Sequence, residues 1–562
     1  MTSLDGIRIA AAPAAALLLA AGCGGAMASS RRSPGVVEND AFKPSRPPAA
    51  SYGPDPSYTC PERGINGMID GDVASVNAKP DGRLCALAET LLGWEGSDTP
   101  PESVMAVLSS DFGLPLTVRR VVITTMQTAE ETSKGSSGGG AQPRDIADRL
   151  IEPIKSFAST AQVPRYGVVV ERIKRGLSKL VLVMQDQLLE MQPLPRKLNP
   201  GQTATFSGQL AGNLTNAKVQ YTDAVGKLER AETGGGKSFS VPLKCGDKPG
   251  RMIVQAAGEQ EGADVLVATF PVGCGRELPV AAALPKAGGK QAGTLDPATG
   301  EKMLADFINQ ERTQAGIKPV TVDADLSKVA RSLADDRAKG KGITSDAVQD
   351  RLKAAEISAP VILLSEGQAT SAEDAHTRFS NSPQDRANSM NQDVTQVGIG
   401  IAPGPKIGDQ PSIIVTELFM KQLPPPDPDD IKAKLYGAIA RRRGDARVGS
   451  VAKDPQLDQI AQTYADELAK EKGKVAKERV AAIEAPLYKS FATVNEIGGV
   501  KADPLEFAEE PGVVGDAKLV GVGVGVGSSP QFGKNSTYVV ILMGKKHTKP
   551  PPAAKQQPVK KR

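Results

Sequence analysis

Apolar residues recur with a period of two in one part of the chain and with a helical period in others. From Leu198 to Gly275, short runs rich in β-branched and aromatic residues alternate with turns that contain Gly, Asn or Asp. Such runs predict strands, and short strands at regular spacing are typical of a β-sandwich. The pattern therefore predicts an all-β sandwich over residues 194–275.

The block at residues 297–421 combines helical and strand-like patterns. Apolar residues at three- and four-residue spacing predict one helix that ends at Gly316 and another that begins after Asp323. The runs VGIGIA and SIIVTELFM then predict strands near the end of the block. Because glycines alternate with apolar residues in VGIGIA, we expect a neighbour to pack closely against one face of that strand.

The same pattern recurs in weaker form. Residues 431–546 repeat the second helix and its Gly-alternating strand, which predicts a second, degenerate copy. In that copy Glu496 is predicted to stand where Glu366 stands in the first, and it has no acidic partner identifiable from sequence. Residues 59–193 are interpreted as either a third, fainter copy or a separate α+β domain.

Composition separates these blocks. Pro-rich residues 276–296 and 422–430 are predicted linkers. Residues 23–58 are rich in Gly, Ser, Pro and Ala without apolar periodicity, so they are predicted to be a flexible tether that cannot offset its ordering entropy. The basic, Pro-rich tail at residues 547–562 is predicted to be disordered.

The N-terminus predicts export. Residues 1–22 have the apolar core and small final residues of a signal peptide, and the residues before Cys23 resemble the lipobox of bacterial lipoproteins. That resemblance implies cleavage before Cys23, its acylation and a stable membrane anchor. The alternative is a simple export signal with an incidental cysteine.

The remaining cysteines form an even set in an exported chain: Cys60, Cys85, Cys245 and Cys274. Such a set predicts two disulfides with three possible connectivities, and proximity favours pairing the first with the second and the third with the fourth. A zinc site is the rival, but no pair has C-x-x-C spacing and the chain has 2 histidines. We therefore expect disulfides and no metal.

The stretch NSPQDRANSMNQDVTQVGIG, residues 381–400, carries a family resemblance. It resembles the CAP superfamily of cysteine-rich secretory, antigen five and plant pathogenesis-related proteins, in its bacterial form. Other matching pieces are Asn309–Arg312, Asp325–Leu326, Ser365–Gly367 and Phe379. The resemblance covers most of residues 297–421 and implies an α-β-α sandwich. The fold class expected is α+β, with CAP-like domains in tandem with an immunoglobulin-like all-β sandwich.

The resemblance also implies a cleft in which metal-binding members place two histidines and two acids. Here Gly342–Ser345 contains no histidine, and Asp385 stands at the position of the other. Glu366 and Asp385 are the candidate cleft residues, and two carboxylates fall short of a full oxygen shell even for calcium. His376 is expected at an exposed or capped edge position, because most histidines outside sites are satisfied there. Arg386 is expected to pair with a carboxylate inside the domain and Asn388 to cap a turn.

Two further signals exclude function classes. The segment AETGGGKS, residues 231–238, fits a relaxed phosphate-loop pattern, but a polar run precedes it and a strand-like run follows, so it is predicted to be a hairpin turn. A net charge of +4 over 562 residues is too dilute to indicate nucleic-acid binding.

The sequence thus predicts a non-catalytic cell-envelope lipoprotein that needs no cofactor and has no catalytic residues. Its expected partners are the membrane, through the lipid anchor, and envelope polymers, lipids or other proteins. The expected location is the cell envelope, at the outer membrane if the cell has two, with secretion as the alternative. The alternative functions are a carboxylate-dependent hydrolase and a lipid-binding protein that use the CAP cleft.

Overall fold

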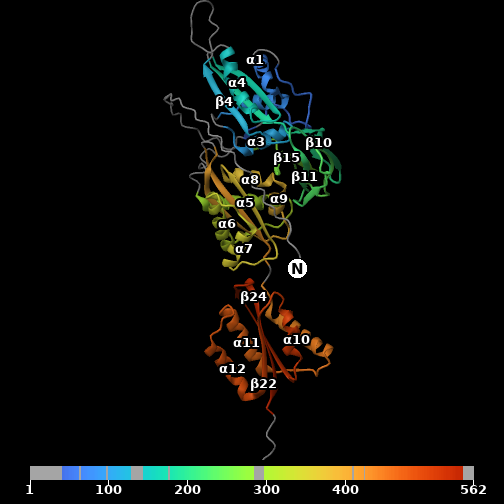
Figure 1. Cartoon of the computed structure of the whole chain (residues 1–562), viewed down its shortest axis with the longest axis vertical. Coiled ribbons are helices and arrows are strands. Elements are labelled where there is room, and N and C mark those ends of the chain that lie inside the picture. Colours follow the sequence, from blue (N-terminus) through green and yellow to red (C-terminus); the bar gives the residue numbers. More distant parts are fainter. Residues whose placement is uncertain are drawn as a thin grey trace, which may run out of the picture. The chain divides into compact units, whose positions relative to one another are not determined.

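The computed structural model describes residues 41–42, 44–61, 65–95, 99–127, 143–174, 177–280, 282–283, 296–407, 410–422 and 425–547. The chain divides into two compact units. The first comprises residues 1–343 and 361–420, and the second comprises residues 344–360 and 421–562 (Figure 1). No helix within the described ranges is long and apolar enough to span a membrane. Cys23 lies outside those ranges.

The first unit begins with an N-terminal block built around a four-stranded sheet. Its elements are α1 Ile65–Val73, η1 Ala74–Val76, β3 Lys79–Pro80, α2 Gly82–Leu91, α3 Glu102–Asp111, β4 Arg120–Gln127, α4 Pro143–Ala158, β5 Pro164–Lys174 and β6 Leu177–Asp186. The strand order is β3-β5-β6-β4, with β3 parallel to β5 and the other pairs antiparallel.

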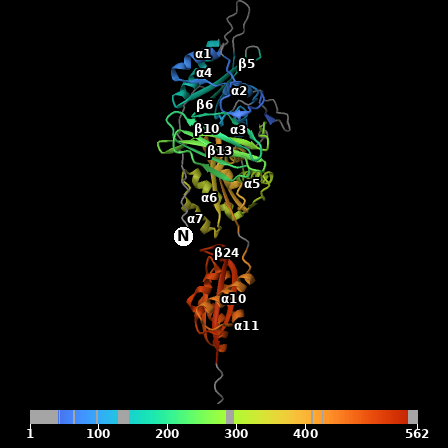
Figure 2. The ribbon, with the colours of Figure 1, turned by 90° about the vertical axis from the view of Figure 1, so that its right-hand side faces the viewer.

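The middle block, also in the first unit, contains the motif at residues 381–400. Its elements are α5 Pro297–Gln314, β17 Thr321–Val322, α6 Ala324–Ala338, β18 Ile362–Ala369, α8 Ala372–Ser380, α9 Pro383–Ser389, β19 Gln396–Ile407 and β20 Gln410–Met420. In chain order, α7 Ser345–Ala354 follows α6 and belongs to the second unit. The sheet order is β17-β19-β20-β18. Apolar residues of α5 and α8 share one core with the sheet. Figure 2 shows the helices α5 and α6 of this block beside its sheet.

The second unit holds the C-terminal block. Its elements are α10 Pro428–Asp445, β21 Ala452–Lys453, α11 Pro455–Lys470, α12 Lys477–Ser490, β22 Phe491–Val500, η3 Pro504–Glu509, η4 Pro511–Val514, β23 Leu519–Ser529 and β24 Gly533–Lys546. The strand order is β21-β23-β24-β22. One core joins α10 to the sheet and another joins α11 and α12 to it, so helices cover both faces.

The three blocks therefore share one topology. In each, the strands lie in the order first, third, fourth, second when they are numbered along the block. The short first strand is parallel to the third, and the other neighbouring pairs are antiparallel. Each second helix also begins at an aspartate whose carboxylate accepts backbone N–H groups: Asp81, Asp323 and Asp454. Whether the N-terminal block is a third copy or a separate α+β domain stays a prediction.

Two sheets, antiparallel apart from one short parallel edge pair, follow the N-terminal block and form the sandwich. The first has the order β13-β10-β7, and the second has the order β12-β11-β14-β15-β9. The strands are β7 Leu189–Met191, β9 Lys197–Leu198, β10 Thr203–Leu210, β11 Thr215–Thr222, β12 Leu228–Ala231, β13 Ser238–Lys244, β14 Gly250–Gln260 and β15 Ala263–Cys274. A single apolar core fills the space between the sheets. Mixed α and β content is thus observed, while the immunoglobulin-like assignment stays a prediction.

The segment at residues 231–238, which resembles a phosphate loop, connects β12 to β13, with Gly234 and Gly235 at positive φ. This is a turn between strands, as the sequence predicts, and no helix begins there to hold a phosphate.

Part of the predicted tether is packed. Strands β1 Ala41–Phe42 and β2 Ser51–Tyr52 pair with β16 Ala282–Ala283 and β8 Leu194–Pro195. The Tyr52 side chain is fully buried in the sandwich core and donates to the carbonyl oxygen of Pro271 at 2.6 Å. The tether prediction for residues 23–58 is therefore wrong for this part, because a single aromatic residue supplies buried area that composition averages hide.

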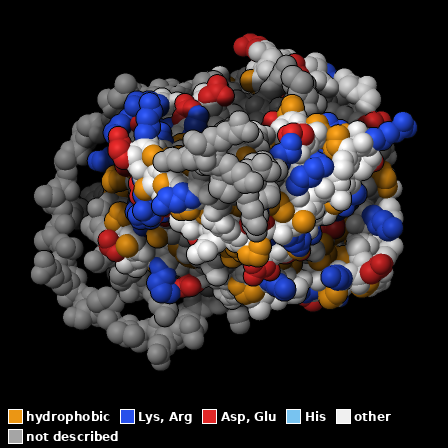
Figure 3. Space-filling view, turned by 90° about the horizontal axis from the view of Figure 1, so that it is seen from below, with side chains coloured by type: hydrophobic (Ala, Val, Ile, Leu, Met, Phe, Trp, Pro, Cys, Tyr) orange, Lys and Arg blue, Asp and Glu red, His pale blue; other side chains and the backbone are white. Residues whose placement is uncertain are grey.

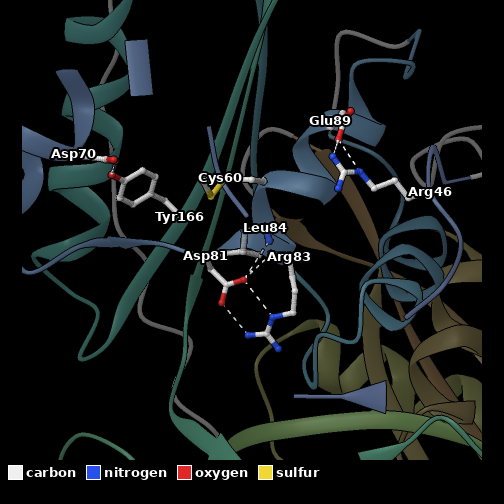
Figure 4. The surroundings of a disulfide bond; sticks show 9 residues. Arg46, Cys60, Asp70, Asp81, Arg83, Leu84, Glu89 and Tyr166 are labelled. Carbon is white, nitrogen blue, oxygen red and sulfur yellow. Dashed lines mark hydrogen bonds and ion pairs between the residues drawn. A yellow bond between two sulfur atoms is a disulfide. The ribbon is translucent and has the colours of Figure 1, made fainter. Parts of the chain in front are cut away.

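Each disulfide joins two consecutive cysteines of the four: Cys60 with Cys85 and Cys245 with Cys274. These are the pairings that proximity favours. The first fastens the segment before α1 to α2, beside Asp81 and Arg83 (Figure 4). Asp81 caps α2 and also accepts two guanidinium hydrogen bonds from Arg83, so this helix start is fixed both covalently and electrostatically.

The glycine-alternating strands pack against helix backbone, as their pattern predicts. A Cβ atom on Gly398 would lie 2.4 Å from the carbonyl carbon of Leu326 in α6. A Cβ atom on Gly521 would lie 2.2 Å from that of Leu457 in α11. Leu326 and Leu457 each stand three residues after the capping aspartate of their helix. The second helix of each copy is therefore seated on a strand that has no room for a side chain there.

Candidate functional site

Carboxyl groups gather around strand β18 of the middle block. Glu366 lies on β18, Asp385 lies in the first turn of α9, and Glu417 lies on β20. Sheet register pairs Ser365 with Glu417, so these two side chains share a face of the sheet. Adjacent strand residues point to opposite faces, so Glu366 lies on the other face, towards α6. The two sequence candidates, Glu366 and Asp385, therefore approach β18 from different sides.

Glu417 is the most deeply buried of these acids. Its exposure is 1%, and its Oε1 atom has no hydrogen-bond partner among the described residues. Burial, with a smaller contribution from the nearby charge of Asp385, raises the pKa of Glu417 to about 8. At neutral pH its protonated form is therefore favoured.

The pKa values of Asp385 and Glu366 are shifted in the same direction. Burial raises the pKa of Asp385, while hydrogen bonds from Ser382 and Ser365 oppose the shift. Burial also raises the pKa of Glu366, and Arg337, whose Nε lies 3.8 Å from Glu366 Oε1, opposes it. The Glu366 Oε2 atom has no partner within the described part of the chain. All three carboxyl groups are thus poorly compensated.

Comparison with the sheets of the other two blocks shows that Glu417 is specific to the middle block. Each of the three sheets has a strand glycine that packs against the start of the second helix of its block. When the sheets are aligned on these glycines, Leu182 of β6 and Ile541 of β24 lie at the position of Glu417. Both are fully buried apolar residues. The same fold is therefore built elsewhere in this chain with a hydrocarbon side chain at that point.

The same register corrects one prediction about the C-terminal block. Gly498, not Glu496, occupies the position of Glu366, and Glu496 matches Leu364. Glu496 also has the acidic partner that sequence did not identify. Burial and a hydrogen bond with Glu484 of α12 raise the pKa of Glu496 to about 7. The predicted correspondence between Glu366 and Glu496 is therefore wrong.

A second charged cluster lies on the outer side of the motif. Glu311 of α5 forms an ion pair with Arg386 of α9, as the sequence predicts, and another with Arg251 of the sandwich at 2.8 Å. Burial opposes ionisation of Glu311, but the two guanidinium groups outweigh it and lower its pKa to about 2. This carboxylate therefore stays charged throughout the physiological range.

His376 belongs to this cluster and is more buried than expected. Its ring stacks on Phe307 with centroids 5.2 Å apart, and its Nε2 lies 4.0 Å from Glu311 Oε2. The side chain is 23% exposed, and burial lowers its pKa. The predicted exposed or edge position is therefore wrong, because the α8 helix turns His376 towards α5.

Asn388 also differs from its predicted role as a turn cap. Its Nδ2 donates to the carbonyl oxygen of Leu364 at 2.9 Å and to Ser365 Oγ at 3.2 Å. The side chain therefore ties α9 to the outer edge of β18.

The motif and the preceding helix α8 together contact both neighbouring blocks of the first unit. Thr269 of the sandwich donates from Oγ1 to the carbonyl oxygen of Asn381 at 2.7 Å. Arg378 of α8 pairs with Glu102 of α3 at 3.0 Å. The segment that carries the family resemblance is thus an interface inside the chain.

Within the described residues, no group of three or more His, Cys, Asp or Glu side chains is arranged to hold a metal ion. The protonated form of Glu417 is also a poor ligand, because a carboxyl group must lose its proton to bind a cation. The donor set here therefore does not fit a transition metal.

Sequence reasoning missed Glu417. The signal was present, because Glu417 is the single acid inside the run SIIVTELFM, and an ionisable side chain in a continuous apolar strand is costly unless it has a role.

Replacing Glu417 by Gln tests the burial argument. The pKa of Glu417 in the folded state lies above the unfolded value of about 4.5, so the folded state keeps the proton to higher pH. This group therefore reduces the stability progressively as pH rises from about 4.5 to 8, and the whole loss is present above pH 8. Glu417→Gln removes that loss, and we expect a stability gain on the order of 3 kcal/mol at pH 9 and little change at pH 5. Calorimetry at both pH values measures it, with exposed Asp306→Asn as the control. An equal effect at both pH values would contradict the assignment.

The profile of the cysteine-rich secretory protein family (CAP) matches residues 305–419. An extracellular SCP-domain protein of Bacillus anthracis is similar, at 14% identity and a TM-score of 0.21, over 39% of this chain and 78% of that one. An outer surface protein of Borrelia burgdorferi is similar at 19% identity and a TM-score of 0.20, over 24% and 99%. A cysteine-rich secretory protein of Staphylococcus aureus is similar at 12% identity and a TM-score of 0.20, over 46% and 83%. Among curated proteins no relative matches.

Proposed function

From the premise that residues 305–419 form a CAP superfamily domain, we propose that this protein is an exported, non-catalytic binding or structural protein of the cell envelope. In this proposal the middle block is a structural centre of the first unit, and binding is left to other surfaces. The lipid anchor at Cys23 is part of the proposal.

The observation that carries the proposal is the use of the motif as an internal interface. Glu311, Arg386 and Arg251 form a buried ion cluster between the middle block and the sandwich. Met390, just after α9, lies against the sandwich so closely that a Cβ atom on Gly226 would fall 2.2 Å from Met390 Cβ. Residues committed to such contacts are not available to a diffusing substrate.

The state of the acids supports the same conclusion. A general base for hydrolysis needs an ionised carboxylate or neutral imidazole within reach of a water molecule. Here Asp385 is held by two hydroxyl groups, Glu417 favours its protonated form, and His376 lies in the cluster around Glu311. The raised pKa of each of the three carboxyl groups disfavours the ionised form that a base requires.

The test combines cation binding with turnover. We expect that calcium and zinc at 1 mM, added separately, shift the melting temperature of the wild type no more than that of the double variant Glu366→Gln, Asp385→Asn. We also expect identical rates for the two proteins on ester, peptide and glycoside reporter substrates. Exposed Asp306→Asn serves as a matched charge control. Stabilisation by a cation, or turnover that the double variant loses, would overturn the non-catalytic assignment.

The anchor has its own test. We expect Cys23→Ser to move the protein from the membrane fraction to the soluble fraction, because the acyl chains provide most of the membrane affinity. Immunoblotting of fractionated cells measures the shift, with export checked by protease accessibility. A Cys23→Ser protein that remains with the membrane would disprove lipidation as the means of attachment.

The face of the molecule in Figure 3 shows lysine, arginine, aspartate and glutamate side chains interspersed, with apolar side chains between them. Mixed charge of this kind gives no extended field of one sign. On that face, binding would depend on local shape and paired charges.

A further inference from the structure

Strand β22 forms an outer edge of the sheet in the second unit. It is 10 residues long, contains no proline, and has several exposed side chains. An edge strand presents a row of N–H and C=O groups that can pair with another chain, and proteins usually shorten, charge or cover such edges. This edge therefore needs an explanation.

Sheet register shows which groups face outward. The N–H of Val522 in β23 donates to Asp458 Oδ1 at 2.8 Å, away from β24. Because backbone groups alternate sides along an antiparallel strand, the groups of Ile541 then point towards β22, and those of Glu496 and Gly498 point outward. In the described part of the second unit, these outward groups have no hydrogen bond to another backbone group.

The matching edge in the middle block is covered. There Asn388 of α9 donates to the carbonyl oxygen of Leu364, the residue that occupies the position of Glu496. Between β22 and β23 the C-terminal block has η3 and η4 in place of α8 and α9. The copy that lacks the motif therefore also lacks the side chain that closes this edge.

A groove of about 460 Å³ runs along the open edge. Its lining combines β22 with the two 3-10 turns: Asn495, Glu496, Ile497, Gly498, Gly499, Val500, Lys501, Phe507, Glu510 and Gly512. Gly498 and Gly499 have no side chains, so a second backbone can approach closely there. The groove thus offers backbone partners and space together.

The charge at the groove is negative. Lys501 is paired with Glu510 at 2.5 Å, which leaves no net charge from that pair. Glu496 and Glu484 lie in hydrogen-bonding contact, and Tyr464 is a further hydrogen-bond partner of Glu496. Two adjacent carboxyl groups, with no cation among their interaction partners in the described part of the chain, favour a ligand that supplies one.

We propose that the outer edge of β22 binds an extended segment of a partner polypeptide as an additional strand, with a lysine or arginine side chain opposite Glu496. Backbone hydrogen bonds to Glu496 and Gly498 provide the affinity, and the cation next to Glu496 and Glu484 provides the preference. The C-terminal block is thus a peptide-binding module, whereas the middle block, with its edge closed by Asn388, is not.

The test uses the full chain and a labelled probe. The probe is acetyl-Thr-Val-Thr-Lys-Val-Thr-Val-Thr-amide with a fluorescein group, and its partner probe has Glu in place of Lys. We expect fluorescence anisotropy to show binding of the Lys probe, with at least tenfold weaker binding of the Glu probe. Hydrogen exchange is expected to slow at the amides of Glu496 and Gly498 when the Lys probe is added.

Two variants locate the site. Gly498→Pro removes an outward N–H, and Glu496→Lys reverses the local charge, so we expect each to weaken binding of the Lys probe at least tenfold. Glu478→Lys, at an exposed position of α12, makes the same charge change away from the edge and is expected to have no effect. If Gly498→Pro disturbs the fold by circular dichroism, Glu496→Lys carries the test.

Three outcomes would overturn the proposal. The first is unchanged binding in Glu496→Lys, or no slowing of exchange on β22. The second is a dimer that Glu496→Lys dissociates, which would make a second copy of this chain the occupant. The third is probe binding that appears only after residues 548–562 are deleted, which would make the tail of the same chain the occupant.

Discussion

Replacing Arg312 by Lys is expected to reduce the stability of the first unit by about 3–5 kcal/mol. Arg312 is 1% exposed and has no acidic partner among the described residues. Its Nε donates to the carbonyl oxygen of Lys318 at 2.8 Å, and its Nη1 donates to those of Ser389 at 2.6 Å and Asn391 at 2.9 Å. Lysine has one nitrogen at its tip and cannot reach carbonyl groups that are spread around a planar fork.

The C-terminal block contains an arginine with equivalent contacts, on which the same substitution can be tested. Arg443 of α10 occupies the same place in the C-terminal block and donates to the carbonyl oxygens of Gly449, Val513, Gly515 and Ala517. Arg443→Lys is therefore expected to lower the stability of the second unit by a similar amount. Calorimetry should show one transition shifted by each variant, because the two residues lie in different units.

The control for both is Arg331→Lys in α6. Arg331 is 45% exposed and pairs with Glu301, so its replacement should cost less than about 1 kcal/mol. A loss in Arg312→Lys as small as that of Arg331→Lys would show that the buried carbonyl groups find other donors.

Adding one methyl group at Gly400 is expected to be almost as damaging. A Cβ atom there would lie 2.1 Å from the backbone nitrogen of Arg331 and 2.2 Å from the carbonyl carbon of Ala330. Since these are backbone atoms of α6, the helix must move away from the sheet. We expect Gly400→Ala to cost about 3 kcal/mol, measured by chemical denaturation.

Gly342→Ala is the matched control for Gly400→Ala, because a Cβ atom on Gly342 has no heavy atom within 4 Å. It should change stability by less than about 0.5 kcal/mol. Equal effects at the two glycines would show that contact between strand and helix is not what requires glycine at Gly400.

The predictability of this fold depended on whether a signal was local. The alternation in VGIGIA predicted close packing on one strand face, and the structure places Gly398 and Gly400 against α6. The partners of Arg312 come from loops around residues 318 and 389–394, which no sequence spacing connects. Its role as a bridge between loops could therefore not be predicted.

The candidate site shows the same limit. Glu366 and Asp385 were identified by their places in a motif, but their separation onto two sides of β18 follows from sheet register. The shift of two residues between Glu366 and Glu496 follows from register as well. The sequence matched them because the letters Asn-Glu-Ile resemble Ser-Glu-Gly more closely than any other part of β22. The alignment by sequence resemblance therefore differs from the alignment that the hydrogen-bonded strands have in the structure.

The ion cluster around Glu311 has a practical consequence for anyone who wishes to isolate the domain that the family profile matches. A fragment cut at residues 305 and 419 would separate Arg386 from Arg251 and its carbonyl group, and would begin partway along α5. It would also uncover the surface on which Met390 rests. The smallest piece that retains native surroundings for the motif is therefore larger than its family boundaries and includes the sandwich.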